Sequence, residues 1–256
     1  MALNVVVCLK QIPNPDLQFQ IAADGKDIRR DALNYKINGA DEYALEEAVR
    51  LKEKRGGRVV ALTAGPKRTE QMLREALAKG ADEAVRVPME DAGYDVGMVA
   101  RILAAAIRTL PHDLVLTGVQ SDDQGNSATG GLIAGLLGMP HASVVTGVEA
   151  KDGGLEVSTE LEGGLQRVYT VPLPALLTIQ FGANTPRYAP LPAIMKAARQ
   201  PIREIAPAPL APPYTFAVRG LSPPVAKGHA EMVTGSIEEQ AKKLAALLRD
   251  KGFVRR

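Results

Sequence analysis

The alternation of apolar runs with helix-period segments in the first 137 residues limits the possible folds more than any other feature. Four short apolar runs occupy residues 3–9, 58–62, 84–87 and 114–116. Each is followed by a segment with helical spacing of apolar residues, at 41–54, 69–78, 94–110 and 126–137. Each crossover is long enough to be right-handed, which requires a parallel sheet. The pattern therefore predicts an α/β fold, a Rossmann-like parallel sheet with helices on both faces.

The remaining segments predict additions to this sheet. A hairpin or short excursion is expected between the first strand and residue 36, because polar alternation and Gly25 follow the Pro13-Asn14-Pro15 turn. Alternating segments separated by glycine turns predict antiparallel ribbons at 143–149, 155–161 and 165–171, and an apolar strand is expected at 175–179.

The last quarter of the chain has a different composition. Twelve of the eighteen prolines lie between Pro172 and Pro224, which predicts an extended arm. A capped amphipathic helix is expected at 236–251. We therefore predict two regions, an α/β domain at 1–183 and a region at 184–256 with the arm and the helix. The arm either folds back on its own domain or wraps another chain.

Composition excludes several classes of protein. No apolar run approaches the roughly 20 residues that cross a bilayer, and no signal peptide is apparent, so we expect a cytoplasmic protein without membrane insertion. One cysteine and three scattered histidines favour neither a disulfide nor a metal site. From Arg187 onward, twelve basic residues stand against five acidic ones, but no aromatic platform accompanies them. This pattern suits a protein partner or a solvated tail better than a nucleic acid.

The loop after the fourth apolar run is the first candidate site. A parallel strand that feeds a helix through a glycine-containing loop directs backbone N–H groups and the positive end of the helix dipole at one place. Ser127 and Thr129 add hydroxyls that could join these donors around a phosphate. Asp122 and Asp123 would repel a phosphate, so they fit better as helix caps or as acceptors for ribose hydroxyls. An ordinary capped helix without a ligand is the alternative for this stretch taken alone.

The predicted topology brings further loops to the same place. In parallel sheets, ligands bind at the carboxyl ends of the strands where strand order reverses. The loops after the first, second and fourth strands would face one crevice there. The sequence has no P-loop motif, no G-x-G-x-x-G fingerprint and no G-x-S-x-G elbow, and Cys8 has no nearby histidine in the sequence. We therefore predict a binding crevice without catalytic residues.

Six stretches in a fixed order make this chain resemble the β subunits of electron-transfer flavoproteins over essentially its whole length. They are VVVCLKQIPN, DEYALEEAVRLKE, VVALTAGP, AKGADEAV, DLVLTGVQSDDQGNSATG and PRYAPLPAIMKA. The resemblance implies a heterodimer in which an α subunit holds most of a redox FAD and the β subunit carries a buried AMP. Such a protein is an electron carrier and not an enzyme. It accepts electrons from acyl-CoA dehydrogenases and related flavoprotein dehydrogenases, as in fatty acid oxidation, and passes them toward a quinone oxidoreductase.

The resemblance also assigns residues to the nucleotide, with the phosphate nearest residues 126–129. These residues are Cys8, Asn38, Gly39, Ala40, Asp41, Ala64, Gly118, Val119, Gln120, Ser121, Asp122, Asp123, Gln124, Gly125, Asn126, Ser127, Ala128 and Thr129. The family often has Asn-Gln-Thr-Gly where this chain has Ser127-Ala128-Thr129-Gly130. This departure removes an amide side chain but keeps the backbone donors.

Residues 186–197 resemble the loop by which the family docks onto its dehydrogenases. Leu191 would be the anchor in an apolar pocket of the partner, surrounded by Pro190, Pro192, Ile194 and Met195. A leucine between two prolines is stiff, so it loses little conformational entropy on docking. Ordinary packing is the alternative for Leu191 taken alone.

Two other functions remain open at this point. Electron-bifurcating relatives carry a second FAD in place of AMP, and they tend to have Val-Gly-Pro after the acidic loop, where this chain has Thr129-Gly130-Gly131. The second alternative is a free-standing ATP-binding stress or signalling module with the same α/β architecture. The proline-rich arm favours the partner-bound protein, because its apolar residues need a surface to cover them.

Overall fold

The computed structural model describes residues 2–14, 19–30, 33–90, 95–208, 218–224, 228 and 230–254. The chain forms two compact units, residues 1–221 and 222–256. The first unit contains the sheet and the cavity described below. The second contains α6 (Ile237–Asp250), which begins with a capping box between Ser236 and Glu239. None of the helices in the described ranges is long and apolar enough to cross a membrane.

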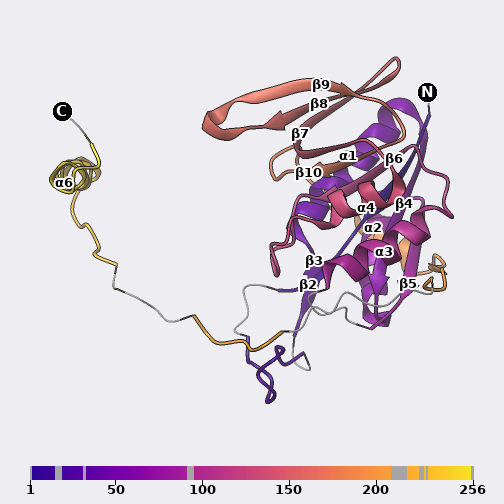
Figure 1. The fold of residues 1–256 in the computed structure, drawn as a ribbon, viewed down its shortest axis with the longest axis horizontal. Helices are drawn as coiled ribbons and strands as arrows, with labels where there is room; N and C mark the ends of the chain where they lie inside the picture. Colours follow the sequence, from indigo (N-terminus) through magenta and orange to yellow (C-terminus); the bar gives the residue numbers. More distant parts are fainter. Residues whose placement is uncertain are drawn as a thin grey trace. The chain divides into compact units, whose positions relative to one another are not determined.

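Five parallel strands form the centre of the first unit (Figure 1), in the spatial order β5-β4-β1-β6-β10. Their bounds are β1 Leu3–Cys8, β4 Gly57–Gly65, β5 Glu83–Pro88, β6 Leu114–Gly118 and β10 Ala175–Ile179. The chain runs outward from β1 to β5 on one side and then returns to add β6 on the other side of β1. Strand order therefore reverses between β1 and β6.

Helices cover both faces of this sheet, which confirms the predicted fold class. They are α1 Gly39–Arg55, α2 Glu70–Lys79, α3 Val96–Ile107 and α4 Thr129–Leu137, with a 3-10 turn at Lys67–Thr69. Val5 and Val7 of β1 belong to one core cluster, with α1 and α2. Val6 and Cys8 point to the other face and pack with α3 and α4. The unbroken apolar run of β1 thus reflects burial on both faces.

Two antiparallel additions agree with the predicted ribbons. The larger one extends the sheet through β7 (His141–Lys151), β8 (Gly154–Glu160) and β9 (Gln166–Val171). β7 pairs with β10 in parallel and with β8 antiparallel, and a register shift lies near Val144, whose φ is 58°. The smaller addition is the hairpin of β2 (Gln11–Pro13) and β3 (Tyr35–Ile37).

The prediction that the proline-rich region is wholly extended is wrong for its first part. Residues 191–197 form the helix α5, and Arg203–Glu204 form β11, which pairs in parallel with β5 at the sheet edge. Pro190 is the N-cap of α5 and Pro192 lies in its first turn, where a missing N–H costs nothing. The two compact units divide after residue 221. The boundary predicted between residues 183 and 184 separates functions and not compact units, and it stays a prediction. Three apolar residues of the proline-rich arm, Leu210, Tyr214 and Phe216, lie outside the described residues.

Candidate functional site

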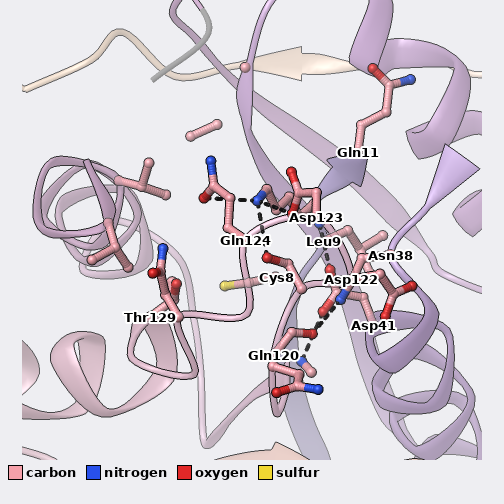
Figure 2. Close-up of a pocket in the computed structure, with 18 of the residues that line it drawn as sticks. Cys8, Leu9, Gln11, Asn38, Asp41, Gln120, Asp122, Asp123, Gln124 and Thr129 are labelled. Atoms are coloured by element: carbon pink, nitrogen blue, oxygen red, sulfur yellow. Dashed lines mark hydrogen bonds and ion pairs between the residues drawn. The ribbon is translucent and has the colours of Figure 1, made fainter. Parts of the chain in front are cut away.

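A cavity of about 330 Å³ opens at the carboxyl ends of the parallel strands. Its walls come from the loops after β1, β4 and β6, from the start of α1, from α3 and from the β2–β3 excursion. This is the place where strand order reverses, so the predicted crevice exists where parallel sheets bind small ligands. Its volume lies within the range of small-molecule sites. Figure 2 shows Cys8 between Thr129 and Asn38 in that view.

Asp41 joins the two central strands at the floor of the cavity. Its carboxylate accepts hydrogen bonds from the backbone N–H of Lys10 at 2.7 Å and from that of Gly118 at 3.0 Å. These donors follow β1 and end β6, so one buried side chain of α1 fixes both loops. Burial raises the pKa of Asp41 to about 7, although these bonds and the side-chain bond with Asn38 lower it. Burial, with the nearby Asp41, also raises the pKa of the Cys8 thiol well above its usual range, so Cys8 is not an activated nucleophile.

Asn38 holds the loop after β6 through backbone groups. Its side-chain N–H donates to the carbonyl oxygen of Gln120 at 2.8 Å, and its side-chain oxygen accepts from the N–H of Asp122 at 2.9 Å. Asp122 in turn accepts a hydrogen bond from the N–H of Gly39 at 3.2 Å. Asp122 therefore caps α1 and not the helix that follows it in sequence. Figure 2 shows Asn38, Gln120 and Asp122 near one another.

Lys10 neutralises the second aspartate of the loop. Its ammonium group lies 2.6 Å from Asp123 and also donates to Ser121 at 3.1 Å and to Gln124 at 3.2 Å. The charge of Asp123 is therefore balanced at the cavity wall, which removes much of the repulsion expected for an anionic ligand. The predicted role of Asp122 and Asp123 as caps of the following helix is wrong, because the N-cap of α4 is Ala128.

The start of α4 leaves backbone donors at the cavity. Ala128 has no side-chain oxygen that could cap the helix, and no side-chain cap hydrogen bond is formed. Ser127 has φ of 49°, in the left-handed region, and Ala128 is helical. Consecutive N–H groups of such a left-handed and right-handed pair can form a concave anion site. Gly130 lets the helix approach the sheet closely, since a Cβ there would lie 2.6 Å from the methyl carbon of Thr178. The geometry can accept a phosphate or a carboxylate.

Gly118 is required where the loop after β6 passes α1. A Cβ at this position would lie 2.4 Å from a carboxylate oxygen of Asp41 and 2.8 Å from the backbone carbon of Ala40. The backbone of Gly118 can thus lie close enough to donate its N–H to Asp41. Gly118 is one of the predicted site residues, and the structure supplies a steric reason for the glycine.

A second wall of the cavity was not predicted from the sequence. The guanidinium carbon of Arg68 lies 4.3 Å from the centre of the Tyr35 ring, and Gln11 donates a hydrogen bond to the backbone oxygen of Arg68 at 3.3 Å. These residues come from β2, β3 and the turn before α2. Arg30 and Lys10 also line the cavity. The only sequence signal for this wall is a basic residue directly after a predicted strand, as Lys10 is after the first strand. Basic residues at strand ends are too common to identify a binding site.

Most residues predicted at the nucleotide do line this one cavity. They are Cys8, Asn38, Asp41, Ala64, Gly118, Val119, Gln120, Ser121, Asp122, Asp123, Gln124, Asn126, Ser127, Ala128 and Thr129. The other three, Gly39, Ala40 and Gly125, stand beside it without forming its wall. Ala40 is fully buried against Gly118, and Gly125 makes a turn with φ of 61°. The structure places these residues together and leaves their contacts with a ligand as a prediction.

The predicted docking residues lie on α5, apart from this cavity. The side chains of Leu191, Ile194 and Met195 are 69%, 48% and 60% exposed. Pro190 and Pro192 begin the helix, which carries Ala197 as its buried contact with the core. Three neighbouring apolar side chains in water on one short helix are unusual for a surface without a partner.

Comparison with known proteins finds one family. The family profile described as "Electron transfer flavoprotein domain" matches residues 27–210. The "Electron transfer flavoprotein subunit beta" of Methylophilus methylotrophus is 39% identical over 262 residues, with 97% of this chain and 98% of the relative covered. The proteins of the same name from Bacillus subtilis (strain 168) and Homo sapiens are 34% and 35% identical. The alignments cover 98% and 80% of this chain, and 100% and 82% of those relatives.

Proposed function

This chain belongs to the electron-transfer flavoprotein β-subunit family, and we propose that it pairs with an α subunit, binds AMP and docks dehydrogenases. The α subunit would hold most of the FAD, which supplies the redox chemistry. This chain would contribute the architecture around a nucleotide and a surface for the electron donor. Electrons would come from acyl-CoA dehydrogenases or related flavoprotein dehydrogenases and pass toward a quinone oxidoreductase. The chain itself would be an electron-transfer carrier subunit and not an enzyme.

The phosphate end of the cavity carries the AMP proposal. The N–H groups at the start of α4 have no partner within that helix, because the first turn of any helix lacks them. The left-handed φ of Ser127 before a helical residue suits a backbone conformation in which consecutive N–H groups can converge on an anion, and Ala128 has no side-chain oxygen to cap them. A phosphate would satisfy these donors and interact favourably with the helix dipole. Ser127 and Thr129 would add hydroxyl donors.

The rest of the cavity suits a nucleoside. Carboxylate and amide oxygens of Gln120 and Asp122 lie at the wall and can accept protons from ribose hydroxyls. Val96, Val99 and Leu103 of α3 offer apolar surface for a purine ring. Ligand-binding cavities of this size typically bury most of the surface of a small ligand. A mononucleotide therefore fits the donors, acceptors and dimensions together.

Nucleotide analysis of the purified heterodimer tests this proposal. Acid release followed by chromatography should give one AMP and one FAD per heterodimer. Two flavins without AMP would contradict the AMP assignment and support an electron-bifurcating relative. A chain that is monodisperse and binds ATP without an α subunit would support a signalling module instead. The visible spectrum of the co-purified complex separates these outcomes further, since only the flavoproteins are coloured.

Docking of a dehydrogenase by α5 is tested separately. Leu191→Ala should weaken docking by about 2 kcal/mol, or roughly 30-fold in affinity, because a buried anchor is lost. Flavin and nucleotide content should stay unchanged. Leu165→Ala is the matched control, since Leu165 is 65% exposed but lies on the turn between β8 and β9. Equal electron-transfer kinetics in wild type and Leu191→Ala would refute the anchor role.

A further inference from the structure

The helix α5 is too short to be stable by its own hydrogen bonds. It has seven residues, whereas isolated helices of fewer than roughly 12 residues are marginal in water. Its three large apolar side chains are exposed, so they contribute little packing. Only Ala197 is buried, against the core that includes α2. Other contacts must therefore hold this helix in one conformation.

At the carboxyl end of α5, one arginine of α2 binds three backbone oxygens. The Arg74 Nη1 atom lies 3.1 Å from the oxygen of Ala197, 2.9 Å from that of Ala198 and 3.0 Å from that of Gln200. The last carbonyls of a helix have no partners within it, and the dipole makes this end negative. A single cationic group thus satisfies the end of α5 and the turn after it.

Before the amino end of α5, a second arginine ties the chain to α1. The guanidinium group of Arg187 contacts Glu46 at 2.8 and 3.0 Å and Glu53 at 2.6 and 3.0 Å. Its backbone N–H donates to Glu46 as well, at 3.2 Å. Asn184 adds hydrogen bonds to Glu47 at 2.9 Å and to the backbone oxygen of Tyr43 at 3.0 Å. Hydrogen bonds to two carboxylates raise the pKa of Arg187, so its charge is fixed.

We propose that Arg74 and Arg187 are positioning residues that clamp α5 at both ends and present Leu191, Ile194 and Met195 to the dehydrogenase in one orientation. This inference rests on the docking role proposed above. Neither arginine needs to touch the partner. A helix that is already ordered loses less conformational entropy when it docks, so the clamp acts on affinity and not on the electron-transfer step.

The test uses the purified heterodimer and its dehydrogenase. Arg74→Gln should raise the KM for the dehydrogenase reaction about tenfold, because α5 must then be ordered during docking. The kcat, the flavin and nucleotide content and the reduction of the flavin by dithionite should be unchanged. Hydrogen exchange of the Ala198, Arg199 and Gln200 amides, which bond to oxygens within α5, should become faster. Arg74→Lys keeps the charge and should recover part of the affinity.

Two controls separate positioning from charge and folding. Arg58→Gln removes one positive charge from β4, where Arg58 pairs with Glu83, and should leave KM unchanged. Glu53→Gln weakens the other end of the clamp at an exposed carboxylate and should raise KM by a smaller factor than Arg74→Gln. If Arg74→Gln fails to assemble, Glu53→Gln against wild type remains the test, and its KM should still rise. Suppose that Leu191→Ala impairs docking. If Arg74→Gln or Glu53→Gln then assembles with both an unchanged KM and unchanged amide exchange, the inference is overturned. If Leu191→Ala also has no effect, the docking role fails, and the inference fails with it.

Discussion

The cavity and the helix α5 are two surfaces of one compact unit, and they are stabilised in opposite ways. The cavity loops are fixed from inside, by the buried carboxylate of Asp41, the amide of Asn38 and close backbone contacts at Gly118. The helix α5 is fixed from its ends by charged side chains, while its apolar residues face water. A small ligand can be enclosed by groups that are already buried. A protein partner needs apolar residues that stay exposed until it arrives.

The two surfaces nevertheless share a structural frame. Arg86 of β5 donates a hydrogen bond to the oxygen of Gly65 at 3.1 Å, and it pairs with Glu204 of β11. Gly65 lines the cavity, and β11 follows α5 in the chain. The loop at the cavity also leads directly into α2, which carries Arg74. Strand β5 and helix α2 therefore connect the cavity to the segment that carries α5.

The largest effect is expected when Asp41 titrates. Burial raises its pKa from 3.8 to about 7, so between these values the folded chain keeps a proton that the unfolded chain has lost. The resulting stabilisation is complete below about pH 4 and is lost as the pH rises through 7. From pH 5 to pH 8 the free energy of unfolding should fall by about 3 kcal/mol from this group. Urea unfolding of the full chain at both pH values measures it.

Asp41→Asn is the matched variant for this measurement. It removes the titrating group, and its amide nitrogen would face a backbone N–H of Lys10 or Gly118. The variant should therefore be less stable than wild type at pH 5 and should lack the fall of about 3 kcal/mol toward pH 8. If the free energy of unfolding changes with pH in the same way in wild type and in Asp41→Asn, the titration of Asp41 does not contribute to the stability of the chain.

A smaller effect is expected from two glycines of the same helix. A Cβ at Gly130 would meet the methyl carbon of Thr178 at 2.6 Å and the hydroxyl oxygen of Thr117 at 2.8 Å, whereas a Cβ at Gly135 meets nothing within 4 Å. Gly130→Ala should cost about 2 kcal/mol of stability, because α4 must move away from the sheet. If the cavity binds AMP as proposed, the same movement should reduce nucleotide retention. Gly135→Ala should stabilise the chain by up to about 1 kcal/mol. Thermal unfolding and nucleotide content of both variants test this prediction. A stability change in the same direction in both variants would contradict it.

The sequence predicts the sheet better than it predicts the site. The β-branched run at 3–9 and the predicted helix at 41–54 correspond closely to β1 and α1, since burial on two faces and helical amphipathicity leave strong patterns. The glycine turn at 152–154 likewise predicts the β7–β8 hairpin. Side chains such as Lys10 and Arg68 reach the cavity through contacts between distant segments. No local pattern encodes such contacts.

The proline-rich region shows why local rules can also mislead. Proline disfavours the helix interior, and twelve prolines suggested an extended arm. In α5, however, two prolines occupy the start of the helix, where their restricted backbone helps it begin. The carboxyl end of α5 is held by Arg74, which lies 123 residues before its partner Ala197 in the sequence. A helix whose support comes from another helix cannot be predicted from its own residues.

The smallest effect on stability, and the sharpest contrast with the cavity, is expected on α5 itself. Met195 is 60% exposed, so Met195→Ser should change the free energy of unfolding by less than about 0.5 kcal/mol. If α5 docks a dehydrogenase, the same substitution should weaken docking by about 1 kcal/mol, because an apolar contact next to the anchor is lost. Met232→Ser alters a methionine that is 81% exposed in the second unit, and it should leave docking unchanged. Equal docking affinities for Met195→Ser and Met232→Ser would mean that the exposed side chain on α5 does not contribute to partner binding. The cavity and α5 would then differ only in how their residues are packed.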